Sequence, residues 1–229
     1  MVTAIFLLGP PASGKSTLSR QLESRHHART FRLREYAGQR ARTDPALAAV
    51  MRRRADPLGW LPDRTAVVLV RDAVSGQFQP AVGSPVVFEG YPGNGYQADY
   101  LARLLSALRL PSLALVLRLP PQAARQRAEA RRVCPACTAE DGEPHRPARL
   151  AENGRCADCG APAQRRDSDE PQRLAARAAR FLQHLPSIRT ALTAQDVPWR
   201  TIDAELPPAL LLAAAEAELH VHLPKGSTP

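Results

Sequence analysis

Lysine is nearly absent from the sequence: Lys15 and Lys225 are the only two among 31 lysine and arginine residues, and the net charge of +9 is carried almost entirely by arginine. Long apolar runs are absent too, since none approaches the ~20 residues that a membrane-spanning helix needs. The apolar stretch near the start has only about seven residues and no basic segment before it, which is too short for a signal peptide. We therefore expect a soluble, cytoplasmic protein with no membrane partner.

Aromatic residues are scarce as well, at 5% of the chain. Proteins that hold single-stranded nucleic acids usually combine a basic groove with aromatic stacking platforms. The positive charge is therefore a weak argument for a nucleic-acid partner, and much of the arginine fits solvated helix surface. Lys15 stands out against this background, because its compact ammonium group differs chemically from the guanidinium that the chain uses elsewhere.

Residues 9–17 read GPPASGKST and fit the phosphate-binding pattern G-x-x-x-x-G-K-[ST], between a predicted strand and an amphipathic helix. Glycines let successive backbone N–H groups turn toward a polyphosphate, and the helix N-terminus adds a favourable dipole. Lys15 would reach the β and γ phosphates, and a hydroxyl of Ser16 or Thr17 would hold Mg²⁺. The pattern thus predicts a nucleoside-triphosphate site. Its predicted ATP-binding residues are Gly9, Pro10, Ala12, Ser13, Gly14, Lys15, Ser16 and Thr17.

Strands and helices are expected to alternate along the chain. We predict strands at 3–8, 29–33, 84–89, 112–119 and 198–203, and helices at 15–24, 63–74, 97–109, 121–132, 169–185 and 207–219. Four of the five strands are near-continuous apolar runs, as buried parallel strands are. The alternation favours an α/β fold, the three-layer fold of P-loop nucleotide-binding proteins with a five-stranded parallel sheet.

Two segments interrupt this alternation. Residues 34–62 contain a small helical excursion, and residues 131–165 are mostly polar and contain all four cysteines. The remaining residues (1–33, 63–130 and 166–229) form the predicted core. Ligands of open α/β sheets bind at the carboxyl ends of the strands, and both insertions are expected to lie over those ends.

The strand predicted at 84–89 ends in a lone carboxylate, Glu89, and opens into a loop with Pro92, Gly93 and Gly95. On this stretch alone, an ordinary turn after a buried strand fits as well as a binding site does.

The four cysteines form two C-x₂-C pairs, Cys134 with Cys137 and Cys156 with Cys159, separated by eighteen residues. This spacing predicts a closed, structural zinc site, in which the metal supplies much of the folding free energy of a segment poor in apolar residues. Two disulfides and an iron–sulfur site remain as alternatives. A zinc ribbon can also bind nucleic acid, but the position of the cysteine segment inside a P-loop chain favours a lid that the metal holds together.

Together these motifs resemble the adenylate kinase family, specifically its members with a zinc-binding lid. GPPASGKST is similar to the family's phosphate loop, with Ser16 where glycine is usual, and FEGYPGNGYQAD is similar to its strand-end segment. RQRAEARRVCPAC resembles the entry to the lid, and RRDSDEPQRLAARAARF resembles the exit from it. IDA followed by an apolar helix resembles the end of the fold. The order and spacing of these pieces make the resemblance specific.

The resemblance implies transfer of the γ-phosphoryl group of ATP to a nucleoside monophosphate, with Mg²⁺ and a structural Zn²⁺. Arginines at the matching positions stack on adenine or hold the moving phosphoryl group in the family. The implied catalytic residues are Lys15, Arg127, Arg131, Arg166 and Arg177, with Arg127 also binding ATP. Glu89 matches the aspartate that orders water around Mg²⁺, and Ser16 is the implied direct magnesium ligand. The expected partners are ATP and a small-molecule acceptor, and the expected state is a monomer.

The acceptor side departs from the family pattern. The family has an arginine at the position of Gly93 that grips the acceptor's α-phosphate, and residues 34–62 lack the usual arginine motif, which leaves Arg40 or Arg34 as a substitute. Gln97 matches the glutamine that reads the acceptor base. The residues predicted to bind the acceptor are Arg34, Arg40, Glu89, Gly90, Tyr91 and Gln97. The same donor site could therefore serve a nucleoside or another small molecule, and a zinc-ribbon nucleic-acid-binding ATPase is the alternative from another class.

Overall fold

The computed structural model describes residues 4–53, 55–76, 84–137 and 147–222 of the chain. Five parallel strands form one sheet in the order β2-β3-β1-β4-β5. They are β1 (Ala4–Leu8), β2 (Arg29–Phe31), β3 (Val86–Glu89), β4 (Ser112–Arg118) and β5 (Trp199–Asp203). The register pairs Phe6 with Phe88 of β3 on one side and with Ala114 of β4 on the other. The predicted α/β fold with a five-stranded parallel sheet is confirmed.

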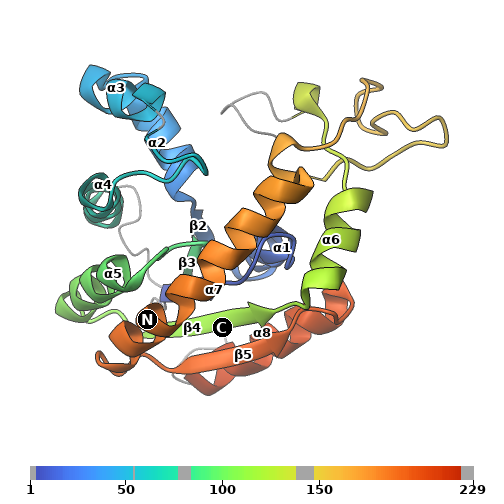
Figure 1. The fold of residues 1–229 in the computed structure, drawn as a ribbon. Helices are drawn as coiled ribbons and strands as arrows, with labels where there is room; N and C mark the ends of the chain where they lie inside the picture. Colours follow the sequence, from blue (N-terminus) through green and yellow to red (C-terminus); the bar gives the residue numbers. More distant parts are fainter. Residues whose placement is uncertain (1–3, 54, 77–83, 138–146, 223–229) are drawn as a thin grey trace.

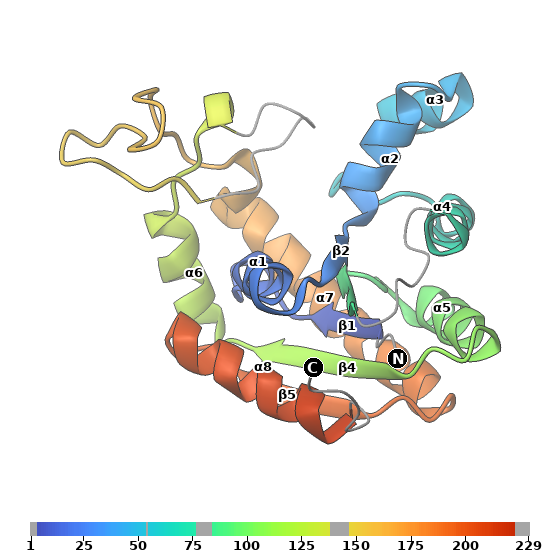
Figure 2. The same ribbon diagram turned by 180° about the vertical axis from the view of Figure 1, so that it is seen from behind.

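Eight α-helices accompany the sheet in the described part of the chain. They are α1 (Lys15–His26), α2 (Leu33–Ala41), α3 (Pro45–Arg53), α4 (Asp63–Ser75), α5 (Gly95–Ala107), α6 (Pro121–Ala130), α7 (Pro171–Thr193) and α8 (Pro208–His222). One face of the sheet packs against α4, α5 and α7, and the other against α1, α6 and α8. Figures 1 and 2 show these three layers from opposite sides.

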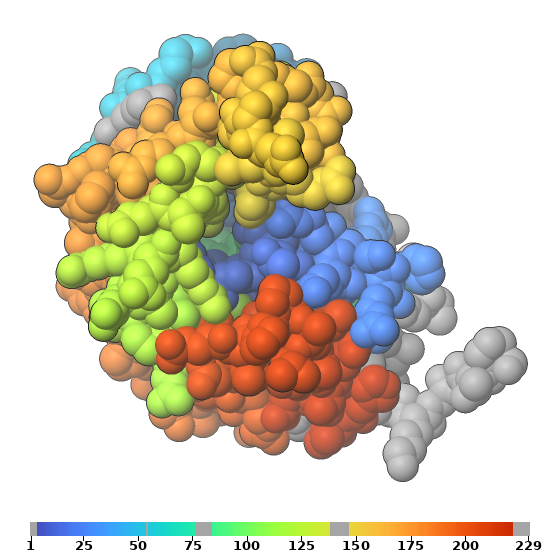
Figure 3. Space-filling model, turned by 90° about the vertical axis from the view of Figure 1, so that its right-hand side faces the viewer, coloured from blue at the N-terminus to red at the C-terminus, as the bar shows by residue number. Residues whose placement is uncertain are grey.

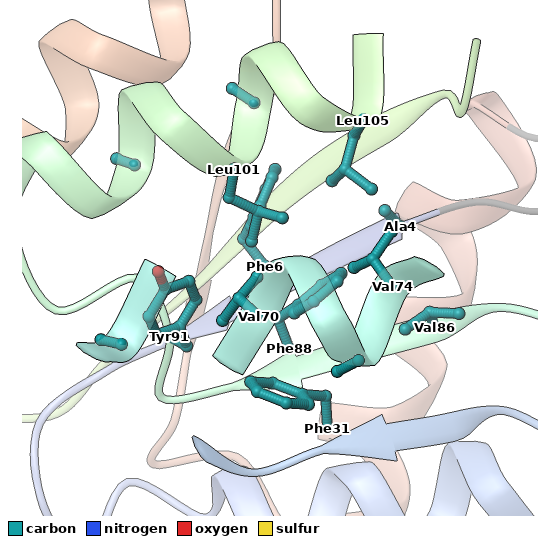
Figure 4. Packing of buried hydrophobic residues seen from close by; sticks show 14 of the residues in the cluster. Ala4, Phe6, Phe31, Val70, Val74, Val86, Phe88, Tyr91, Leu101 and Leu105 are labelled. Atoms are coloured by element: carbon teal, nitrogen blue, oxygen red, sulfur yellow. The ribbon is translucent and has the colours of Figure 1, made fainter. Parts of the chain in front are cut away.

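The central strands are apolar throughout because both of their faces are buried. In β1, Phe6 belongs to the cluster under α4 and α5, whereas Ile5 and Leu7 belong to the cluster under α1 and α8. Figure 4 shows the first cluster, in which the rings of Phe31 and Phe88 lie 5.7 Å apart between centroids, with helix side chains above them. This packing holds the ends of β1 and β3 in place, and the phosphate loop and Glu89 follow those ends.

The described parts of the two segments predicted as insertions extend away from the sheet. The segment with α2 and α3 rises from the β2 edge of the sheet, and residues 147–166 rise beside α6 (Figure 1). Both stand on the same side of the sheet, which is the side of the strands' carboxyl ends (Figure 2). Residue 54 and residues 138–146 of the predicted insertions lie outside the described residues.

One helix is longer than predicted. We predicted a helix at 169–185, ending before Pro186, but α7 begins at Pro171 and continues through Pro186 to Thr193. Proline removes one backbone hydrogen bond and usually ends or kinks a helix. Ile188 and Leu192 lie beyond the proline and are buried in the core, which stabilises the extra two turns. Among the described residues, no helix combines the length and the apolar character that a bilayer crossing requires.

Candidate active site

The phosphate loop connects β1 to α1 at the centre of the sheet, between the strands β3 and β4. A Cβ atom on Gly9 would lie 2.7 Å from the Ser13 hydroxyl oxygen and 3.0 Å from both the Cβ and the carbonyl oxygen of Leu117, so only glycine fits there. Gly14 has a φ of +91° directly before α1, and Ala12 has a φ of +63°. The loop therefore has the tight turn that the glycine spacing predicted.

Lys15 lies across this loop. Its Nζ atom donates to the carbonyl oxygens of Gly9 and Pro10, both at 2.8 Å. Burial, opposed by the Glu89 carboxylate and reinforced by the nearby guanidinium groups of Arg177 and Arg131, lowers the pKa of Lys15 to about 8. The ammonium group thus lies in a strongly positive region, which a bound polyphosphate would neutralise.

Glu89 is the carboxylate nearest to the loop, with its side chain only 8% exposed. It accepts a hydrogen bond from the Ser16 hydroxyl and one from Nε of Arg32 at 2.6 Å. Burial would raise the pKa of Glu89, but Arg32, Ser16 and Lys15 outweigh it and lower the pKa below its usual value. Glu89 is therefore ionised at neutral pH. The hydroxyl and the carboxylate predicted to serve Mg²⁺ lie side by side, as that prediction requires.

Arginines from both ends of the lid segment face the loop. Arg131, directly after α6, binds Asp169 through two hydrogen bonds, of which the one from Nε measures 2.6 Å. Arg177 of α7 donates to the carbonyl oxygen of Ser168 at 3.4 Å. Both arginines, with Arg166, line the same cavity as Lys15. The fold thus brings together three guanidinium groups that lie 35 and 11 positions apart along the chain.

This cavity has a volume of about 290 Å³ and lies between the phosphate loop, the α2 segment and the loop after β3. Pro147 of the lid also lines it. Figure 3 shows the surface hollowed between the lid (yellow), α6 (green) and the N-terminal part of the chain (blue). One end of the cavity is therefore cationic and close to the phosphate loop, and we call it the donor end.

The other end, which we call the acceptor end, is lined by Trp60 and Phe181 among others. The indole of Trp60 lies against Gly93: a Cβ atom on Gly93 would come within 3.0 Å of the indole Cζ3 and 3.2 Å of its Cη2. The guanidinium carbon of Arg180 lies 4.9 Å from the centroid of the indole. Asp56 holds Arg180 with a 2.6 Å ion pair and so ties the Trp60 loop to α7.

A polar network stabilises the loop after β3. Gln97 is 3% exposed, accepts a hydrogen bond from the Gly93 N–H at 2.8 Å and donates to Asp63 at 2.7 Å. Asn94 caps α5 by accepting from the Gln97 N–H, and its side chain donates to the same Asp63 oxygen. The network joins the start of α4 to the start of α5 and so sets the wall of the acceptor end.

The four cysteines gather at one point of the lid, and their sulfur atoms all lie within 4.8 Å of one another. Cys134 and Cys159 have sulfurs 3.4 Å apart, and Cys137 and Cys156 have sulfurs 3.7 Å apart. Tetrahedral zinc with Zn–S bonds of about 2.3 Å requires sulfurs about 3.8 Å apart, so the donor set fits this metal. Backbone N–H groups of Asp158 and Cys159 lower the pKa of Cys156 to about 7, whereas hydrogen bonds with the neighbouring sulfurs raise the pKa of Cys137.

Comparisons with known proteins agree with this geometry. An adenylate kinase from Anaeromyxobacter sp. (strain Fw109-5) is 30% identical over 182 residues, which cover 77% of this chain and 81% of that protein. The chain belongs to the adenylate kinase family. Adenylate kinases of Anaeromyxobacter dehalogenans and Methanothrix thermoacetophila are 28% and 25% identical and match 77% and 73% of the chain. No family model matches the chain.

Some residues predicted from the adenylate kinase resemblance lie away from the cavity. Arg127, in the last turn of α6, is not among the described residues that line it. Arg40 lies at a separate hollow with Tyr36 and Asp72, whereas Arg34 lines the main cavity and donates to the carbonyl oxygen of Leu58 at 2.6 Å. The geometry therefore favours Arg34 over Arg40 as an acceptor-side residue.

The cavity is also lined by the other residues predicted to bind the acceptor, Glu89, Gly90, Tyr91 and Gln97, and the last three have other roles as well. Pro10, predicted to bind ATP, is not among the lining residues. Gly90 has a φ of +67°, which gives the turn after Glu89 its shape. Tyr91 is 1% exposed and packs in the core against Phe31. The Gln97 amide, predicted to read an acceptor base, is engaged in the network with Asp63. Each of these acceptor roles stays a prediction.

Sequence reasoning missed three residues of this site: Arg32, which binds Glu89; Asp169, which holds Arg131; and Trp60, which lies beside Gly93. Arg32 and Asp169 are two of many charged residues in the chain, so nothing in the local sequence distinguishes them from surface charges. The sequence does distinguish Trp60, because the chain has only two tryptophans and this one lies in the insertion expected over the site.

Proposed function

We propose that the protein is an ATP-dependent phosphotransferase that moves the γ-phosphoryl group of ATP to a small-molecule acceptor. The observation that carries this proposal is the convergence of Lys15, Arg131, Arg166 and Arg177 on the phosphate loop. Phosphoryl transfer requires little covalent work from the protein, so positioned positive charge supplies most of the rate enhancement.

Each part of the donor end has a task in this reaction. The phosphate loop and Lys15 hold the β and γ phosphates, and the three arginines neutralise the charge that spreads over the transferred group. Ser16 and Glu89 would hold the Mg²⁺ that accompanies ATP, and that ion would offset negative charge on the phosphates. The lid, residues 131–165, would exclude water that otherwise competes as acceptor.

Two classes of acceptor compete for the other end of the cavity. The relatives are named adenylate kinases, and this name favours a nucleoside monophosphate such as AMP. The second class is an unphosphorylated nucleoside or another small molecule with a hydroxyl group. A specific observation favours it: Gly93 and Trp60 stand where the family grips the acceptor's phosphate with an arginine. In both cases residues 34–62 would act as the acceptor-binding insertion.

ADP formation from MgATP tests the phosphotransferase proposal, with AMP, CMP, UMP, GMP and their nucleosides supplied one at a time. Lys15→Ala should abolish turnover while circular dichroism stays unchanged. Lys225→Ala is the matched control, because it removes the only other lysine of the chain. Full turnover by Lys15→Ala would overturn the proposal.

A further inference from the structure

Two side chains of α7 hold the ring of Trp60. The guanidinium carbon of Arg180 lies 4.9 Å from the indole centroid, and the ring centroid of His184 lies 5.7 Å from it. A guanidinium over an indole at this distance is attracted to the negative face of the ring. Trp60 lines the cavity, whereas Arg180 is not among the described residues that do. Arg180 would therefore influence a bound acceptor only through Trp60 and the turn that carries it.

Asp56 ties the same guanidinium group to that turn. Nη1 of Arg180 donates to Oδ2 of Asp56 at 2.6 Å, while Oδ1 accepts from the N–H groups of Leu58 at 2.7 Å and Trp60 at 3.3 Å. Burial would raise the pKa of Asp56, but the Arg180 hydrogen bond and these N–H groups outweigh it and lower the pKa. One carboxylate thus shapes the turn with one oxygen and joins it to α7 with the other.

The helix that anchors this turn also carries a cation of the donor end. Arg177 lines the cavity and precedes Arg180 by three positions, so the two side chains are neighbours on the surface of α7. Phe181, directly after Arg180, lines the cavity as well. Because α7 continues into the core, it holds the wall formed by Trp60 at a fixed distance from the guanidinium group of Arg177.

We infer that Arg180 is a positioning residue for the acceptor. It holds Trp60 by the cation–π contact and the Trp60 turn by the ion pair with Asp56, and it thereby fixes the wall of the acceptor end relative to Arg177. The inference rests on the proposed function, and it holds for an acceptor with or without a phosphate group. Loss of Arg180 should loosen the acceptor end and leave the phosphate loop and the donor cations in place.

A matched control lies on the same helix. The only other tryptophan of the chain, Trp199 in β5, has the guanidinium carbon of Arg189 5.9 Å from its ring centroid. Neither Trp199 nor Arg189 is among the described residues that line the cavity. Arg180→Gln and Arg189→Gln therefore remove the same kind of contact from α7, and only the first should affect the acceptor.

The first test follows the fluorescence of Trp60 without any substrate, in a Trp199→Phe background. Arg180→Gln should shift the emission to longer wavelength and raise the acrylamide quenching constant at least twofold, because the ring loses its anchor; Arg189→Gln should change neither. Arg180→Lys keeps the charge but not the planar group, so it should lie between the two and serves if Arg180→Gln does not fold. Unchanged emission and quenching in both Arg180 variants would overturn the inference.

The second test separates acceptor binding from the donor end. With the acceptor that the unaltered protein phosphorylates fastest, Arg180→Gln should raise the acceptor KM at least fivefold, while kcat and the Kd of ATP, measured by calorimetry, change less than twofold. Arg189→Gln should leave all three unchanged. An unchanged acceptor KM, or an equal loss of ATP affinity, would overturn the inference alone. If the unaltered protein phosphorylates no acceptor, the proposed function fails as well.

The third test asks whether Asp56 and Arg180 act as one anchor. Asp56→Asn keeps the oxygen that accepts from Leu58 and Trp60 but removes the charge, so it should raise the acceptor KM too. The double variant with Arg180→Gln should raise this KM no further than the larger single effect, because both changes break the same contact. Single effects that multiply in the double variant would show two independent contributions and overturn the single anchor.

Discussion

Asp169→Asn tests whether the buried pair with Arg131 holds the cationic end of the cavity. The Asp169 side chain is 3% exposed, and it binds Arg131 through two hydrogen bonds. Removing one partner of a buried pair leaves the other charge without compensation, which costs about 3–5 kcal/mol. The Arg131 side chain is 18% exposed, so water partly compensates its charge and we expect a cost at the lower end of that range, about 3 kcal/mol.

Urea unfolding of the zinc-saturated protein measures this cost. With a slope of about 2 kcal/mol/M, a loss of about 3 kcal/mol lowers the midpoint by about 1.5 M. Asp99→Asn is the matched control: Asp99 also pairs with an arginine, Arg103, but the two side chains are 41% and 66% exposed. Exposed pairs of this kind contribute about 0.5 kcal/mol or less. Equal midpoints for the two variants would refute the reasoning. Phosphoryl transfer should fall only in Asp169→Asn, because only Arg131 lines the cavity.

Three further outcomes are expected. Gly38→Ala should stabilise the protein by about 0.5–1 kcal/mol in thermal unfolding, because a Cβ atom added at this position of α2 would meet no atom within 4 Å. Gly9→Ala should destabilise it, because a Cβ atom there would clash. Equal effects of the two substitutions would contradict the glycine argument. ATP affinity of the free protein, measured by calorimetry, should weaken as pH rises through about 8, where Lys15 loses its charge; a constant affinity would contradict the lowered pKa. Elemental analysis should find one zinc per chain, and a chelator should lower the melting temperature, reversibly on zinc addition; unchanged melting would remove the zinc lid.

Features that depend on residues close together in the sequence could be predicted from it. The phosphate loop has a fixed spacing of glycines and one lysine, and the two C-x₂-C pairs carry their ligands within one turn. The parallel sheet was readable because strands buried on both faces are apolar throughout. These patterns predicted the phosphate loop around Lys15 and the gathering of the four cysteines at one point.

The tertiary structure alone decided which distant residues meet. Helix α7 continues past Pro186 because Ile188 and Leu192 find core partners, and packing outweighs the local signal of the proline. Arg34, rather than Arg40, reaches the cavity because α2 begins at Leu33 and turns Arg40 toward another hollow. The contact between Trp60 and Gly93 joins an insertion to the end of a strand, and no local pattern encodes it. Such contacts depend on how packed elements are placed in space, and they shape the end of the cavity where the acceptor would bind.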